Sequence, residues 1–187
     1  MLQENLINVQ AKIDAALARR TEEKITGNKV TLVAVTKNHP AEVITDAFNL
    51  GVPVIGENRV QEAKAKREIV GKGSGRWHLI GHLQTNKAKQ AVAIFDMIES
   101  ADSVHLMQAV DKEAAKAGKV QEILLQVNIA REEQKTGFSP EDYEAVVPEL
   151  DNFKNLHVRG LMVIAPAAEN SEDIRWVFAE GYKLYCK

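Results

Sequence analysis

The stretch Val30-Thr31-Leu32-Val33-Ala34-Val35-Thr36-Lys37-Asn38-His39-Pro40 decides the fold class. Its continuous apolar run is typical of a strand that is covered on both faces, as strands of parallel sheets are. Pro40 follows at a place where a helix can begin, because proline is favoured in the first helical turn. Ligands of parallel α/β proteins bind beyond the carboxyl ends of the strands, so this pattern presents Lys37 to a candidate site.

Similar strand-then-helix units follow along the chain. Further strands are expected at 52–55, 77–80, 94–98, 122–129 and 157–164. A leading amphipathic helix is expected from Leu2 to Leu17, with its apolar side packed on the core. Six such units predict a parallel sheet, either open and doubly wound or closed as a (β/α)8 barrel. A barrel typically takes ~250 residues, so the length of 187 residues by itself favours the open sheet.

The composition excludes several classes of partner. Lys and Arg total 24 against 26 Asp and Glu, which gives a net charge of -2 and no global attraction to nucleic acid or an anionic membrane. The single cysteine, Cys186, precludes an intrachain disulfide and fits a reducing compartment. The amino terminus has no secretory leader, and no run is long enough to span a membrane. We therefore expect a cytoplasmic protein without nucleic-acid or membrane partners.

Polar side chains recur at the expected carboxyl ends of the strands. Lys37 is the one amine among them, and the others are Glu57, Asn58, His82, Gln84, Glu99 and Asn128, with Met162 as an apolar member. Burial lowers the pKa of a lysine from its usual ~10.4 and yields the neutral amine that forms a Schiff base with an aldehyde. Spacing alone leaves a simpler alternative open, in which Lys37 reaches solvent or pairs with Glu57.

Two other clusters carry weaker signals. His78 and His82 lie four residues apart, but no third ligand follows at a regular spacing, so we expect no metal site. Lys64, Lys66 and Arg67 form a basic stretch of an expected helix, interleaved with glutamates. That pattern indicates a solvated face with salt bridges rather than a nucleic-acid surface.

Several segments resemble the pyridoxal-phosphate homeostasis proteins of the YggS type. They are Leu-Val-Ala-Val-Thr-Lys (32–37), Ile-Gly-Glu-Asn-Arg-Val-Gln-Glu (55–62), Trp-His-Leu-Ile-Gly-His-Leu-Gln-Thr-Asn-Lys (77–87), Val-Asn-Ile (127–129) with Lys-Thr-Gly-Phe (135–138), and Arg-Gly-Leu-Met (159–162). The matches keep the family's order and extend over nearly all of the chain. The resemblance implies a (β/α)8 barrel of TIM type with a leading helix, like the amino-terminal domain of alanine racemases, and overrides the length argument.

The resemblance also implies a cofactor, pyridoxal 5'-phosphate (PLP). Lys37 would hold PLP as a Schiff base, Asn58 would lie beside the ring, and Ile80 and Met162 would contact it. Residues 1–187 would form a single PLP-binding barrel domain with about six of the eight βα units, because the chain ends earlier than the family does. The two later segments that cradle the phosphate in such proteins do not occur in it.

The implied function is intracellular PLP homeostasis without turnover, with PLP and apo forms of PLP-dependent enzymes as partners. His82, Gln84 and Asn86 belong to a family signature without an assigned role, and Lys135 is a candidate secondary amine for the cofactor. Two alternatives remain. One is a PLP-dependent racemase-like enzyme, which needs a second acid or base that the strand ends do not offer. The other is a cofactor-free scaffold, suggested by the missing phosphate segments.

Overall fold

A computed structural model describes residues 1–20, 27, 29–71, 73 and 75–187. In this part of the chain, six parallel strands form one sheet in the sequential order β1-β2-β3-β4-β5-β6. The strands are β1 Val33–Val35, β2 Val54–Glu57, β3 Arg76–Leu79, β4 Met97–Ala101, β5 Gln121–Gln126 and β6 Leu156–Met162. A doubly wound sheet reverses its strand order partway. The sequential order confirms the barrel type and shows that the length argument for an open sheet was wrong.

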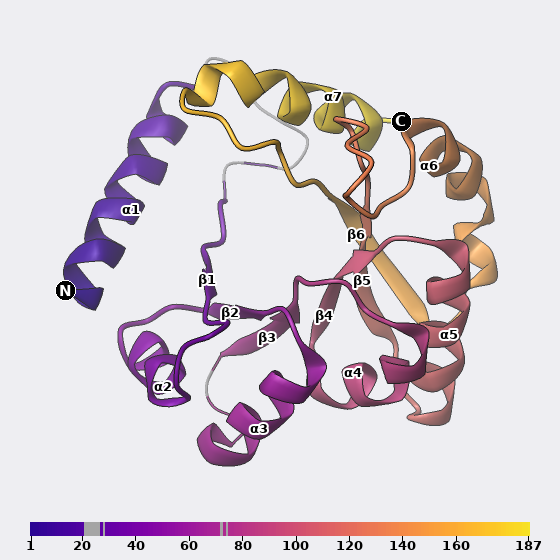
Figure 1. Cartoon of the computed structure of the whole chain (residues 1–187), viewed down its shortest axis with the longest axis horizontal. Coiled ribbons are helices and arrows are strands. Elements are labelled where there is room, and N and C mark those ends of the chain that lie inside the picture. Colours follow the sequence, from indigo (N-terminus) through magenta and orange to yellow (C-terminus); the bar gives the residue numbers. More distant parts are fainter. Residues whose placement is uncertain (21–26, 28, 72, 74) are drawn as a thin grey trace.

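Helices connect the strands and cover the convex face of the curved sheet (Figure 1). The α-helices are α1 Leu2–Ala18, α2 Glu42–Asn49, α3 Val60–Val70, α4 Ala88–Ile94, α5 Val104–Lys116, α6 Pro140–Val146 and α7 Arg175–Tyr185. Short 3-10 helices lie at Thr85–Lys87, Val147–Asn152 and Ser171–Ile174. Ser103 and Ser139 cap α5 and α6, since their side chains accept hydrogen bonds from Leu106 N and Asp142 N.

The core lies between the sheet and the helices on its convex face. Alternate strand residues such as Ile55, Leu79 and Ile123 point there and are completely buried. Helix residues such as Ile44 and Met107 meet them from the other side, also without exposure. Burial of this layer is the main contribution to stability, at about 25 cal/mol per Å² of apolar surface.

The fourth strand was placed wrongly by the sequence analysis. Of the expected residues 94–98, only Met97 and Ile98 belong to it, because Ile94 ends α4 and β4 begins at Met97. Helix α4 was not expected at all. Glu99, expected at a strand end, therefore lies inside β4. The apolar run before Asp96 resembles a strand in sequence, although most of it belongs to a short helix in which Ala88, Ala91 and Val92 are buried.

The leading helix forms as expected, but the expected packing of its apolar side on the core was wrong. No residue of α1 is buried, and Ile7 is 61% exposed. Figure 1 shows α1 at the left of the view, between α7 and α2, and its Leu6 and Ile7 line the same cavity as Val30 and Thr31 of the segment that leads into β1.

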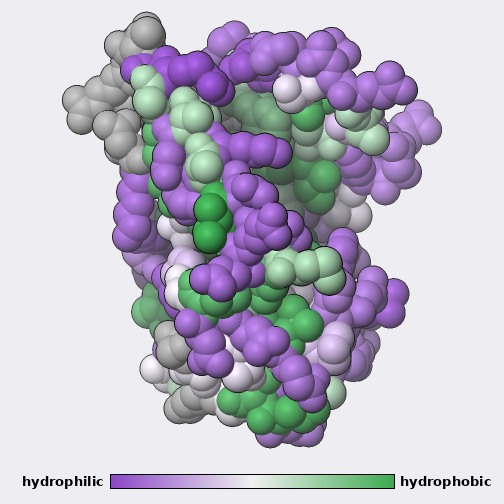
Figure 2. All heavy atoms as spheres, turned by 90° about the vertical axis from the view of Figure 1, so that its left-hand side faces the viewer, coloured by the Kyte–Doolittle hydropathy of each residue, from purple (hydrophilic) through white to green (hydrophobic). Residues whose placement is uncertain are grey.

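The concave face of the sheet contains a cavity of about 880 Å³. Val33, Val54 and Leu124 line it together with charged side chains, including Arg76 and Arg159. On the face seen in Figure 2, hydrophilic residues cover most of the surface, and some hydrophobic ones are set back in a hollow between them. The interior of the curved sheet is therefore open and mixed in polarity, in contrast to the apolar core on the convex side.

Candidate functional site

The strand register brings three of the predicted site residues to one place. Val35 pairs with Gly56, and Gly56 pairs with His78. Two residues further along each strand's chain are Lys37, Asn58 and Ile80, so all three follow directly on the carboxyl ends of adjacent strands, at the carboxyl edge of the sheet. The backbone pairing continues to that edge, since Thr36 N donates to Gly56 O at 3.0 Å and Ile80 N to Glu57 O at 2.9 Å.

Two glycines shape this edge. A Cβ atom on Gly56 would lie 3.0 Å from Ile80 Cδ1 and 3.2 Å from Val33 Cγ1, so these two side chains close over the glycine on the concave face. A Cβ atom on Gly81 would lie 2.4 Å from the backbone oxygen of Asn58. The ends of β2 and β3 can approach each other this closely only because Gly81 has no side chain.

Met162, the fourth predicted residue, ends β6 at the same edge of the sheet. It lies at the other end of the strand order from Lys37, and Val127 N donates to its carbonyl oxygen. Its side chain is half-buried, as are those of Asn58 and Ile80. Lys37, Asn58 and Ile80 thus follow the ends of three adjacent strands, and Met162 ends the strand at the opposite edge of the sheet.

The Lys37 side chain is exposed, so the burial assumed in the sequence argument is not met. Of the simpler alternative, the part in which Lys37 reaches solvent agrees with this exposure, whereas the pair between Lys37 and Glu57 does not form. Glu57 pairs instead with Lys66, at 2.7 Å between Nζ and Oε1. Among the described residues, the amine of Lys37 has no hydrogen-bond or ion-pair partner.

Part of the signature segment gathers beside Asn58. Asn58, Arg59, His82, Gln84 and others line a small pocket of about 250 Å³. His82 Nδ1 lies 2.9 Å from Asp102 Oδ2, a partner that the sequence did not suggest. Asn86, in contrast, is exposed on the following 3-10 helix.

Lys135 reaches the end of β6 from the loop after β5. Its amine donates to the backbone oxygens of Ala165, at 3.1 Å, and Ile164, at 3.4 Å. It also forms an ion pair with Glu132. These contacts hold the amine on the Met162 side of the mouth of the curved sheet.

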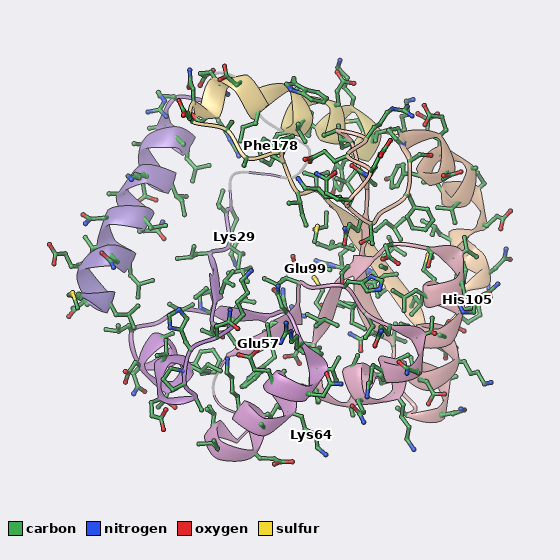
Figure 3. All side chains as sticks on the ribbon, viewed as in Figure 1. Lys29, Glu57, Lys64, Glu99, His105 and Phe178 are labelled. Carbon is green, nitrogen blue, oxygen red and sulfur yellow. The ribbon has the colours of Figure 1, made fainter. Side chains whose placement is uncertain are left out.

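The interior of the sheet contains a second titratable pair. His78 Nδ1 lies 2.6 Å from Glu99 Oε1, and Figure 3 shows Glu99 pointing toward the centre of the curved sheet. Within the described ranges, no three His, Cys, Asp or Glu side chains are grouped so that they could hold a metal ion. No helix in the described part of the chain is long and apolar enough to cross a membrane.

Comparisons with known proteins place this geometry in a family. The family described as alanine racemase, N-terminal domain, matches residues 15–179. A pyridoxal phosphate homeostasis protein of Aquifex aeolicus is 38% identical over 97% of this chain and 78% of its own length. The structure of PipY from Synechococcus elongatus, solved with PLP bound, is 35% identical and superposes with a TM-score of 0.77, covering 94% of this chain and 80% of PipY.

The fold extends to more distant enzymes. An alanine racemase of Clostridium difficile superposes with a TM-score of 0.69 over 84% of this chain and 42% of the racemase, at 16% identity, which shows a shared fold alone. These relatives and the family match support the resemblance that was inferred from the sequence segments at the strand ends. The chain belongs to the pyridoxal phosphate homeostasis protein family, whose fold is that of the alanine racemase N-terminal domain.

Proposed function

We propose that this protein binds PLP at the carboxyl edge of its sheet and acts in PLP homeostasis, with residues 1–187 as one cofactor-binding domain. The observation that carries the proposal is the register of β1, β2 and β3, which adjoin in the sheet and are followed by Lys37, Asn58 and Ile80. The family membership and the PLP-bound PipY structure support it.

In this proposal, Lys37 bonds covalently to the cofactor. PLP supplies an aldehyde, which condenses with a lysine amine as one water leaves. The amine of Lys37 is exposed and has no hydrogen-bond or ion-pair partner in the described part of the chain, so it is available for such a bond. Ile80, which packs over Gly56 on the concave face, offers an apolar contact to the ring, and Asn58 offers an amide beside it.

Met162 would complete the apolar contacts from the opposite side of the mouth.

We further propose that the protein holds the cofactor without turnover and passes it to apo forms of PLP-dependent enzymes. A racemase needs a second acid or base near the cofactor. The tyrosines do not support one, because Tyr143, Tyr182 and Tyr185 all lie in α6 and α7 and none at the edge with Lys37.

The test is to incubate the protein with PLP, reduce it with borohydride and map the added mass by peptide mass spectrometry. The expected result is labelling of the peptide that contains Lys37, lost in Lys37→Ala and retained in Lys64→Ala. Lys64 is a suitable control because it lies on α3 with 60% of its side chain exposed. Equal labelling of the Lys37→Ala variant would contradict the assignment.

A second measurement separates a carrier from a racemase. The PLP-loaded protein is incubated with L-alanine in deuterated water, and exchange of the α-proton is followed by NMR. We expect no exchange above that given by free PLP. Faster exchange that depends on Lys37 would favour the racemase function instead.

A further inference from the structure

A buried ionic cluster lies directly behind Lys37, on the convex side of the sheet. It consists of Thr36, Glu57, Glu62 and Lys66, and we call it the Lys66 cluster. Glu57 is completely buried and Lys66 is 6% exposed, although the sequence analysis expected Lys66 on a solvated helix face. Lys66 instead lies on the buried side of α3, together with Val60 and Ala63.

The ammonium group of Lys66 is fully satisfied by three acceptors. It donates to Glu57 Oε1, to Glu62 Oε1 and to the backbone oxygen of Thr36, each at 2.7 Å. An ammonium group has three N–H donors, so each one has a partner here. Figure 3 shows the contrast with Lys64 on the same helix, which points away from the sheet.

The Lys66 cluster holds the backbone on both sides of Lys37. On one side, Thr36 is held through its carbonyl oxygen by Lys66, and its hydroxyl donates to Glu57 Oε1 at 2.6 Å. On the other side, Asn38 N donates to Glu62 Oε1 at 2.7 Å. Lys37 therefore lies between two residues that the ammonium group of Lys66 holds: Thr36 directly, and Asn38 through Glu62.

The backbone at Asn38 has an uncommon conformation that its hydrogen bond to Glu62 holds. Its φ of 62° lies in the left-handed region, which residues other than glycine adopt at a cost. Conformations of this kind persist where surrounding contacts hold them, and they concentrate at functional sites. The hydrogen bond to Glu62 is the contact that holds Asn38 N, and Lys66 fixes the position of that carboxylate.

The charges of the cluster favour its ionised form. Burial acts to lower the pKa of Lys66, but the hydrogen bonds that it donates to Glu57 and Glu62, together with their negative charges, outweigh burial and raise that pKa above its usual value. The hydrogen bond from Lys66 in turn lowers the pKa of Glu62, against a smaller opposing effect of burial. The ion pairs that hold the turn are thus kept over the neutral pH range.

We propose that Lys66 is a positioning residue for Lys37. It contacts no cofactor. It fixes the turn from which the Lys37 amine reaches the mouth of the sheet, and so links the outer helix α3 to the site. This role rests on the proposed function of Lys37 as the cofactor lysine, and it predicts that a change on the convex side weakens cofactor binding on the concave side.

The test compares Lys66→Met with Lys64→Met, two identical substitutions two residues apart on α3. PLP affinity is measured by the visible absorbance of the bound cofactor, and exchange of the Asn38 amide is measured by hydrogen–deuterium exchange of the cofactor-free protein. Lys66→Met should weaken PLP binding about tenfold, the effect expected from loss of a hydrogen bond to a charged group. It should also speed Asn38 exchange, and Lys64→Met should change neither.

Pyridoxal, which lacks the phosphate, should lose affinity by the same factor, because the cluster acts through Lys37. Glu62→Ala provides a second variant that keeps the buried pair of Glu57 and Lys66, and it should also speed exchange at Asn38 and weaken PLP binding. Unchanged PLP affinity and exchange in both Lys66→Met and Glu62→Ala would overturn the inference. If the unaltered protein does not attach PLP at Lys37, the proposed function fails, and Asn38 exchange alone then decides whether the cluster holds the turn.

Discussion

Substitution of Gly81 by alanine gives the sharpest test of how the site is built. The new Cβ atom would lie 2.4 Å from the backbone oxygen of Asn58 and 2.7 Å from its Cα atom. The shorter distance is about 1 Å below the 3.4 Å at which ordinary contact begins. Both contacts are to backbone, which cannot rotate away as a side chain can, so the end of β2 must move.

The expected cost follows from that displacement. Overpacking a tightly packed region typically costs 1–3 kcal/mol, and a clash with backbone belongs to the upper part of that range, about 2–3 kcal/mol. Asn58 would move with the strand end, so PLP binding should weaken as well. The assay is urea unfolding with linear extrapolation, which reports the free energy of unfolding for each variant.

Gly181→Ala is the matched control. Gly181 lies within α7, and its Cβ atom would come no closer than 3.5 Å to Val163, which is ordinary contact. The same substitution should therefore stabilise the protein there by roughly 0.5–1 kcal/mol, because alanine favours helix over glycine. If Gly81→Ala lies within about 0.5 kcal/mol of the unaltered protein, the ends of β2 and β3 are not packed as described.

The remaining predictions concern the Lys66 cluster and a helix cap. Because the pKa of Lys66 is raised, its contribution to stability is complete below its usual pKa of 10.5 and is lost as pH rises through the raised value. Because the pKa of Glu62 is lowered, its contribution is present above 4.5 and is lost as pH falls through the lowered value. The difference in unfolding free energy between the unaltered protein and Lys66→Met should thus be largest between these limits, and a difference independent of pH would contradict the ion pairs. Ser139→Ala should cost about 1 kcal/mol by removing the acceptor for Asp142 N, measured by thermal unfolding.

The sequence predicts the main elements of this fold because its signals are local. The run before Lys37, Gly51 after α2 and the serine caps each identify a boundary without reference to the rest of the chain. The order of the strands is not local, and it was inferred from the resemblance rather than from spacing. Helix α4 was missed because seven residues span only two turns, too few for a periodicity to appear.

The candidate site could be predicted only in part, because only some of its residues follow from local sequence signals. Lys37 and Asn58 were expected at one edge because each follows a strand, and parallel strands bring their ends together, whereas Ile80 was named from the resemblance alone. The role of Lys66 could not be identified, since it lies in a stretch rich in charged residues, among them Lys64 and Glu68, which are exposed. Its burial depends on Glu57 and Thr36, which are distant in the chain and meet it only after β1, β2 and α3 pack.

The open concave face has a thermodynamic consequence. Val33 and Leu124 line the cavity and are only half-buried, and Val30 remains 43% exposed. Apolar surface that is already hydrated in the folded state adds nothing to the heat-capacity increase on unfolding, which is normally ~12–15 cal/mol/K per residue. The heat-capacity increase per residue on unfolding of this chain should fall below that value. The free energy of unfolding should therefore vary less steeply with temperature than that of a barrel of equal length with a filled interior.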